Sequence, residues 1–138
     1  MADLQHARSL RDLIVYQRAR QASRMAFDLS KRFPREEAYA LTDQLRRAVR
    51  SIGGQIAEAW GKRRYERHFV SKLTDADAEQ LETQHWVEVA EDSGYISTEQ
   101  RDQLLGLLFE VGRMLNSMIA KADQFCGPVV RNDPGAGH

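Results

Sequence analysis

The fold is decided by one stretch, Leu41-Thr-Asp-Gln-Leu-Arg-Arg-Ala-Val-Arg-Ser-Ile-Gly-Gly-Gln-Ile-Ala-Glu-Ala-Trp60. Its apolar residues recur in steps of three and four, which is the spacing of one face of an α-helix. They are Leu41, Leu45, Ala48/Val49, Ile52, Ile56 and Ala59/Trp60. Gly53-Gly54 interrupts this pattern, because each glycine costs about 1 kcal/mol of helix propensity relative to alanine. We therefore predict an amphipathic helix over about 36–61, with a kink or a close backbone contact at the glycine pair.

Three more helices are predicted outward from this stretch. The chain has no proline between Arg35 and Gly127, and no segment alternates apolar and polar residues as a strand would. Ser9-Leu-Arg-Asp12 and Ser97-Thr-Glu-Gln100 have the residue spacing of capping boxes, and Gly94 suits a helix C-terminus. The additional helices are expected over about 10–32, 65–92 and 97–126.

Four long helices with short links predict an all-α, up-down-up-down antiparallel four-helix bundle. The bundle is expected over 10–126, after an N-terminal arm (1–9) and before a disordered C-terminal tail (127–138) rich in Gly, Pro, Asn and Asp. In the third helix the residues expected to face inward are Phe69, Leu73, Ala76, Gln80, Thr83/Gln84, Val87 and Ala90. In the first helix small residues dominate the inward face, which favours a close approach of the neighbouring helix.

The charge of the chain is unevenly distributed. The 138 residues fit a single domain, and 20 Lys+Arg balance 20 Asp+Glu to a net charge of zero. Residues 1–72 contain 16 Lys+Arg and 8 Asp+Glu (net +8), whereas residues 73–138 contain 4 and 12 (net −8). The neutral total therefore does not exclude a partner of strong charge.

The sequence favours a cytoplasmic protein without a membrane anchor. Its first residues lack the apolar core of a signal peptide, and no run reaches the roughly 18 apolar residues of a membrane span. Cys126 is the only cysteine, which excludes an internal disulfide framework and a cysteine-built zinc site.

Basic residues cluster on and after the second predicted helix. Arginine and lysine contact phosphates, and aromatic rings beside them stack on unpaired bases. The candidate nucleic-acid-binding residues are Arg46, Arg47, Arg50, Lys62, Arg63, Arg64, Tyr65 and Arg67. The alternative interpretation is that these side chains form a solvated face or pair with the acidic half of a neighbouring helix.

Apolar residues beyond the inward stripes indicate self-association. The candidate oligomer-interface residues are Trp86, Val89, Leu105 and Phe109, which lie off the stripes, and Trp60, which ends the stripe of the second helix. Oppositely charged halves suit a head-to-tail contact between copies, and such contacts close into a ring when the rotation allows. Alternatively, these residues fill a bundle core that is larger than the stripes suggest.

Catalytic motifs are scarce. Glu82-Thr-Gln-His85 has the spacing of half a carboxylate-bridged di-iron site on an inward helix face, but the chain has no second copy, and only Glu58 and Glu79 could add ligands. Cys126 has no motif relation to any histidine, and no glycine-rich phosphate loop follows a strand. We expect no catalytic residue, metal or cofactor, and therefore not an enzyme; a di-metal enzyme is the minor alternative.

Several segments resemble a known family. Asp12-Leu-Ile-Val-Tyr-Gln-Arg-Ala19, Phe33-Pro-Arg-Glu-Glu-Ala-Tyr-Ala-Leu-Thr42 and Leu45-Arg-Arg-Ala-Val-Arg-Ser-Ile52 resemble the four-helix-bundle proteins encoded in intervening sequences of bacterial 23S rRNA genes. Gln55-Ile-Ala-Glu-Ala59, Leu81-Glu-Thr-Gln84 and Gly94-Tyr-Ile96 continue the match, which covers about 10–125. The chain departs from the family where Gly53-Gly54-Gln55 replaces the frequent Pro-Ser-Asn, so a softer helix break is expected here.

That family is similar to the Avd accessory proteins of diversity-generating retroelements. Those proteins are pentameric barrels that contact nucleic acid and a reverse transcriptase. The resemblance therefore implies a ring-shaped homopentamer with a non-catalytic role near RNA or DNA. The alternative is a protein–protein interaction scaffold, or an accessory subunit of a reverse transcriptase or another protein, that does not itself bind nucleic acid.

Overall fold

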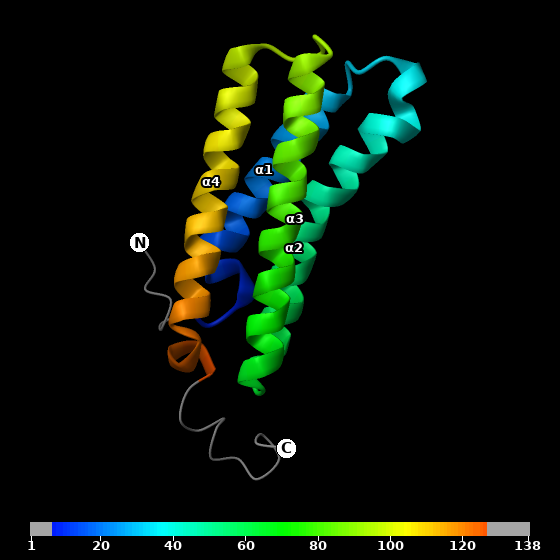
Figure 1. The fold of residues 1–138 in the computed structure, drawn as a ribbon. Helices are drawn as coiled ribbons and strands as arrows, with labels where there is room; N and C mark the ends of the chain where they lie inside the picture. Colours follow the sequence, from blue (N-terminus) through cyan, green and yellow to red (C-terminus); the bar gives the residue numbers. More distant parts are fainter. Residues whose placement is uncertain (1–6, 127–138) are drawn as a thin grey trace.

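The structure, a computed structural model, describes residues 7–126 and is all-α. Its four long helices are α1 (Ile14–Ser30), α2 (Asp43–Gly61), α3 (Glu66–Asp92) and α4 (Thr98–Ala120). They run alternately up and down beside one another (Figure 1). The described residues contain no strand, as predicted. The first six residues of the predicted arm and the whole predicted tail lie outside the described residues.

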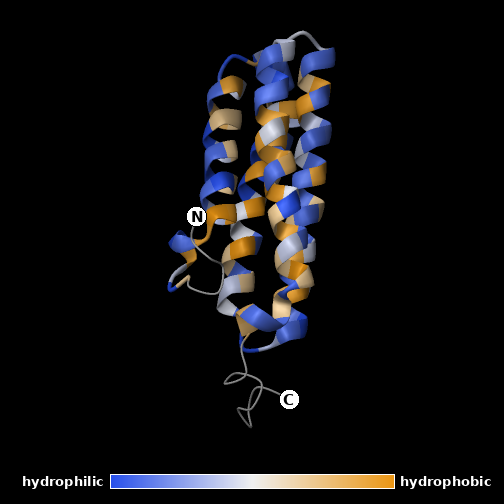
Figure 2. Ribbon diagram, turned by 90° about the vertical axis from the view of Figure 1, so that its left-hand side faces the viewer, coloured by the Kyte–Doolittle hydropathy of each residue, from blue (hydrophilic) through white to orange (hydrophobic). Residues whose placement is uncertain are grey.

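The core lies along the axis enclosed by the four helices. Each helix packs against the next in the chain, and α1 closes the circle against α4. On α3 all seven buried residues belong to the predicted inward stripe: Phe69, Leu73, Ala76, Gln80, Thr83, Val87 and Ala90. Figure 2 shows hydrophobic and hydrophilic residues interleaved along the helices, as expected when one face of each helix is buried. The predicted four-helix bundle is therefore confirmed.

The two N-terminal helices begin differently from the prediction. A 3-10 turn (Leu10–Asp12) precedes α1, and the Asp12 carboxylate accepts hydrogen bonds from the backbone N–H groups of Arg8 (2.9 Å) and Ser9 (3.1 Å). The segment before α2 is a 3-10 turn (Arg35–Glu37) followed by a wide π-helical turn (Ala38–Thr42). The predicted ranges are thus helical over most of their length, but their first turns are not α-helical, and the extended Leu13 separates the 3-10 turn from α1.

The turn between α3 and α4 follows the prediction. Gly94 adopts φ = +81°, the left-handed conformation that glycine supplies at a helix C-terminus. The side chain of Ser97 accepts from the Gln100 N–H (3.1 Å), and the Gln100 side chain accepts from the Ser97 N–H (2.9 Å). Helix α4 ends at Ala120, and residues 122–126 form a further helical turn. Its Phe125 ring stacks on Phe69, with centroids 5.6 Å apart.

Helix α2 continues through the glycine pair. Gly53 and Gly54 are both α-helical, and α2 ends at Gly61 as predicted. A Cβ atom on Gly53 would lie 3.8 Å from Cε1 of Tyr16 on α1. The structure shows neither predicted outcome at the pair, because the helix is not interrupted and the contact with Tyr16 is made by a side chain at an ordinary distance.

The bundle order separates the charges. Residues 10–61, which include α1 and α2, contain 10 Lys+Arg against 6 Asp+Glu (net +4). Residues 73–92 of α3 contain seven Asp+Glu and no lysine or arginine. No helix in the part of the chain that the structure describes is long and apolar enough to cross a membrane.

Candidate functional site

A cleft of about 260 Å³ opens at the surface between α1 and α2. Small residues form its floor, because Ala19 and Ser23 on α1 face Gly53, Gly54 and Ala57 on α2. Larger side chains border it. These are Tyr16, Arg20 and Arg24 from α1 and Val49 and Arg50 from α2. Helix faces that present small residues leave the space between two packed helices unfilled, and this explains the cleft.

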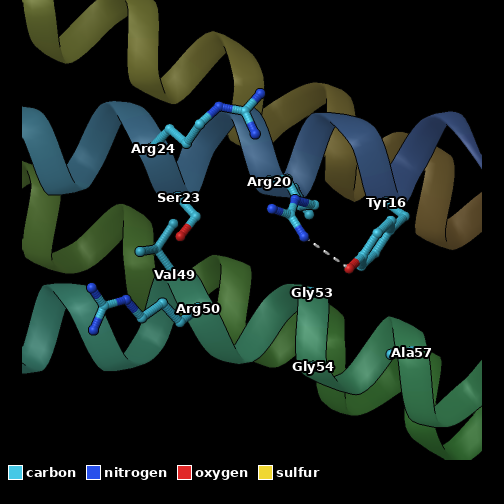
Figure 3. A pocket seen from close by; sticks show the side chains of 10 residues that line it. Tyr16, Arg20, Ser23, Arg24, Val49, Arg50, Gly53, Gly54 and Ala57 are labelled. Carbon is cyan, nitrogen blue, oxygen red and sulfur yellow. Dashed lines mark hydrogen bonds between the residues drawn. The ribbon is translucent and has the colours of Figure 1, made fainter. Parts of the chain in front are cut away.

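The cleft is cationic, since three of its ten lining residues are arginines. Arg20, Arg24 and Arg50 form no ion pair with any carboxylate of the described residues. Arg20 donates from Nη1 to the Tyr16 hydroxyl (3.3 Å), and both side chains reach from α1 toward the glycine pair (Figure 3). Guanidinium groups that lack a carboxylate partner are available for an anion from outside.

Three cationic side chains lie against one aromatic ring beside the cleft. The ring centroid of Phe27 on α1 lies 4.6 Å from the guanidinium of Arg46, 5.5 Å from that of Arg50 and 4.9 Å from Lys31 Nζ. Arg46 also donates to the Ser30 hydroxyl (2.8 Å). Lys31 also pairs with Asp28 (3.6 Å), whereas Arg46 and Arg50 have no carboxylate partner among the described residues. Cation–π contact holds the two arginines in place without neutralising their charge.

The basic turn between α2 and α3 is a second, separate cluster. Arg46 and Lys62 are 16 residues apart. At a rise of about 1.5 Å per residue, they therefore lie about 24 Å apart along the axis of α2. The predicted nucleic-acid-binding residues therefore form two groups, one on α2 and one at the α2–α3 turn. Lys62, Arg64 and Arg67 are exposed at this turn, and Tyr65 is half-buried with its ring 5.5 Å from that of His68.

Arg63 has a structural role within this cluster. Its Nε donates to the Trp60 carbonyl oxygen (2.9 Å) at the end of α2, and its guanidinium lies 3.4 Å from the centroid of the Trp60 ring. Burial lowers the pKa of Arg63 below its ordinary value. Arg63 thus covers one face of the Trp60 ring and satisfies a backbone carbonyl in the last turn of α2.

The predicted oligomer-interface residues are mostly half-buried. Trp60, Trp86, Val89 and Leu105 pack against the core, and Phe109 remains 49% exposed. Tyr39 (84% exposed) and Leu81 (55% exposed) are large apolar side chains at the surface that the prediction did not include. A core larger than the stripes thus accounts for four of the five residues, and self-association itself stays a prediction.

The Glu82 and His85 pair lies on the exposed side of α3, not on the inward face. The Glu82 carboxylate accepts from Trp86 Nε1 (3.1 Å), and the His85 ring lies against Trp86. Glu58 pairs with Lys72 (3.3 Å). Residues 7–126 contain no group of three or more His, Cys, Asp or Glu side chains that could hold a metal ion.

The ion pairs between helices do not involve the arginines of the cleft. Arg18 on α1 pairs with Glu110 on α4 (3.1 Å), and Arg101 pairs with Glu91 (2.7 Å). The alternative that basic residues pair with the acidic half therefore holds for Arg18 and not for the arginines of the cleft. Sequence reasoning counts Arg20 and Arg24 among the basic residues of the first helix, but it does not select Tyr16 or Phe27 as site residues. The glycine pair facing a small-residue stripe was the available signal for the cleft.

Fold and cleft together define a small four-helix-bundle protein with a cationic groove between its first two helices. The chain belongs to the 23S rRNA-intervening sequence protein family, whose model matches residues 11–117. It is also similar to the crystal structure of a protein of unknown function from the S23 ribosomal protein family of Bacteroides thetaiotaomicron. The TM-score is 0.70 and the identity 27%, over 78% of this chain and 96% of that one. A comparison with curated proteins finds no match.

Proposed function

We propose that this protein is a non-catalytic, oligomeric nucleic-acid-associated protein that contacts phosphates through the basic surface of α1, α2 and the α2–α3 turn. The observation that carries the proposal is the set of cations without carboxylate partners: Arg20, Arg24 and Arg50 in the cleft and Arg47 beside them. An isolated bundle gains nothing from holding like charges together, whereas a phosphate backbone binds them and releases counterions.

The test is binding of a labelled single-stranded RNA and a labelled DNA duplex, measured by fluorescence anisotropy at 50 and 200 mM salt. Wild-type binding should weaken by an order of magnitude or more over this range, depending on the number of phosphates contacted. Arg20→Gln/Arg24→Gln/Arg50→Gln, which removes the three arginines of the cleft, should weaken binding at low salt and flatten the salt dependence. The matched control is Arg11→Gln/Arg35→Gln/Arg113→Gln, which removes the same charge from three exposed arginines outside the cleft.

Two results would contradict the proposal. One is no binding of either nucleic acid at 50 mM salt. The other is equal loss of affinity in the cleft variant and its control, since that would reduce the interaction to net charge.

Assembly into a ring-shaped homopentamer is part of the proposal and is supported by the family resemblance.

The second candidate function is an interaction scaffold, or an accessory subunit of a reverse transcriptase or another protein, without nucleic-acid binding. The acidic residues 73–92 of α3 and the exposed Leu81 favour it, because both suit a protein partner. Light scattering at two salt concentrations tests the assembly. A monomer at both would exclude the ring, and dissociation at high salt would favour charge-driven subunit pairing.

A further inference from the structure

The glycine pair on α2 is not explained by the described fold. Neither residue has a positive φ; among the described glycines only Gly94 does. A Cβ atom on Gly54 would meet no atom within 4 Å, and one on Gly53 would make only an ordinary contact with Tyr16 at 3.8 Å. Two alanines would therefore fit, and they would favour the helix. Glycines that weaken a helix without serving its packing leave room for something that binds from outside.

The chemistry of the cleft identifies the kind of occupant. Arg20, Arg24 and Arg50 border it and have no carboxylate partner in the described structure, and the Tyr16 hydroxyl adds a neutral polar group. Guanidinium groups match the oxygen atoms of a phosphate in geometry and charge. A ligand held here must therefore be an anion with several oxygen acceptors.

The size of the cleft limits the occupant further. Its volume of about 260 Å³ is below the range of about 300–1,000 Å³ for sites that enclose a drug-sized ligand. The acidic α3 helix of a second copy is about 10 Å wide, so it would rest on the side chains that border the cleft. Such a partner would not require glycines at positions 53 and 54. One phosphate with its sugar can enter, and the missing Cβ atoms let it approach the α2 backbone closely.

We propose that the cleft between α1 and α2 binds one phosphate–sugar unit of a nucleic-acid strand, with arginine side chains on the phosphate and Gly53-Gly54 as the surface against which the unit rests. This inference rests on the proposed function and makes it specific, because it assigns the contact to a discrete site. Arg20 is the central residue, since it reaches from α1 toward the glycine pair (Figure 3).

The experiment compares Gly53→Ala/Gly54→Ala with Gly106→Ala in the full chain. Gly106 is an exposed helical glycine on α4 whose added Cβ would also meet nothing within 4 Å. Both variants should melt at or above the wild-type temperature. The double variant should bind a single-stranded oligonucleotide about tenfold more weakly, whereas Gly106→Ala should bind like wild type. Arg20→Gln should lower the salt slope of binding by about one unit.

A second measurement separates the cleft from the general function. A nucleoside 5′-monophosphate should raise the melting temperature of wild type and Gly106→Ala, and not that of the double variant; the nucleoside without phosphate should raise none. If the oligonucleotide binds wild type and the double variant equally, the cleft proposal is wrong while nucleic-acid association stands. If wild type binds no oligonucleotide, the proposed function fails. The rise in melting temperature with the nucleoside 5′-monophosphate then decides alone whether the cleft binds a phosphate–sugar unit. If the double variant changes the molar mass in light scattering but not the binding, the cleft holds a second copy and the proposal is overturned.

Discussion

Gly112→Ala should destabilise the bundle, although alanine is the better helix former. Gly112 is buried on α4, where a Cβ atom would lie 3.0 Å from Nε2 and 3.4 Å from Cδ of Gln80 on α3. The Gln80 side chain is 4% exposed and is held at both ends. Its Nε2 donates to Asp77 Oδ1 (3.0 Å), and its Oε1 accepts from Gln84 Nε2 (2.7 Å). Gln80 therefore cannot move aside without losing hydrogen bonds.

The magnitude follows from three contributions. The alanine gains about 1 kcal/mol of helix propensity. Crowding of a well-packed site costs about 1–3 kcal/mol, and each hydrogen bond lost when Gln80 moves costs about 1 kcal/mol. With one hydrogen bond lost, we expect the free energy of unfolding to fall by about 1–3 kcal/mol for Gly112→Ala. Gly106→Ala, which meets no neighbouring atom within 4 Å, should gain up to about 1 kcal/mol instead.

Urea denaturation at fixed protein concentration, followed by far-ultraviolet circular dichroism, measures both variants. The decisive control is Gly112→Ala in a Gln80→Ala background. Once Gln80 is shortened, the contact disappears, and the cost of Gly112→Ala should shrink by at least about 1 kcal/mol. The reasoning is refuted if Gly112→Ala stabilises as much as Gly106→Ala, or if its cost is unchanged when Gln80 is shortened.

Three other substitutions test separate parts of the bundle. The Tyr95 hydroxyl donates to Glu37 Oε2 (2.7 Å), which raises the pKa of Tyr95 above its ordinary value near 10. The stabilisation of the fold by this hydrogen bond is therefore complete below pH 10 and is lost as the pH rises through the raised pKa of Tyr95. Glu37→Gln should lower that pKa, so the absorbance change of the Tyr95 phenolate should occur at lower pH. Ile52→Ala, at a fully buried position, should lower the free energy of unfolding in urea by about 2–5 kcal/mol. Arg63→Ala should uncover Trp60, red-shift the tryptophan emission and cost about 0.5–1 kcal/mol of cation–π contact in the same urea titration.

The sequence predicts the elements of this fold whose physics is local. The inward stripe of α3 follows from helical periodicity, and both halves of the Ser97–Gln100 capping box lie within one turn. The π-helical turn at Ala38–Thr42 could not be predicted in this way, because its residues also suit an α-helix. Tertiary packing decides its shape.

The candidate site depends on a quantity that the sequence does not contain, namely the rotation of α1 relative to α2. The basic residues Arg46 and Arg50 were recognised by type, but their grouping around Phe27 requires the two helices to face one another. The same limitation applies to the contact that Arg63 makes with Trp60. This contact depends on how the chain turns after α2.

The separation of charge between the helices gives a neutral protein an electric dipole. With a sequence pI of about 6.9, the molecule exerts almost no net long-range force on a polyanion near pH 7. A dipole instead experiences a torque in the field of the polyanion, and this torque turns the side with α1 and α2 toward it and the acidic stretch of α3 away. Orientation would thus precede contact, and the fraction of productive collisions would exceed that of a uniformly neutral surface. The same dipole would let the protein bind both cation- and anion-exchange media at low ionic strength.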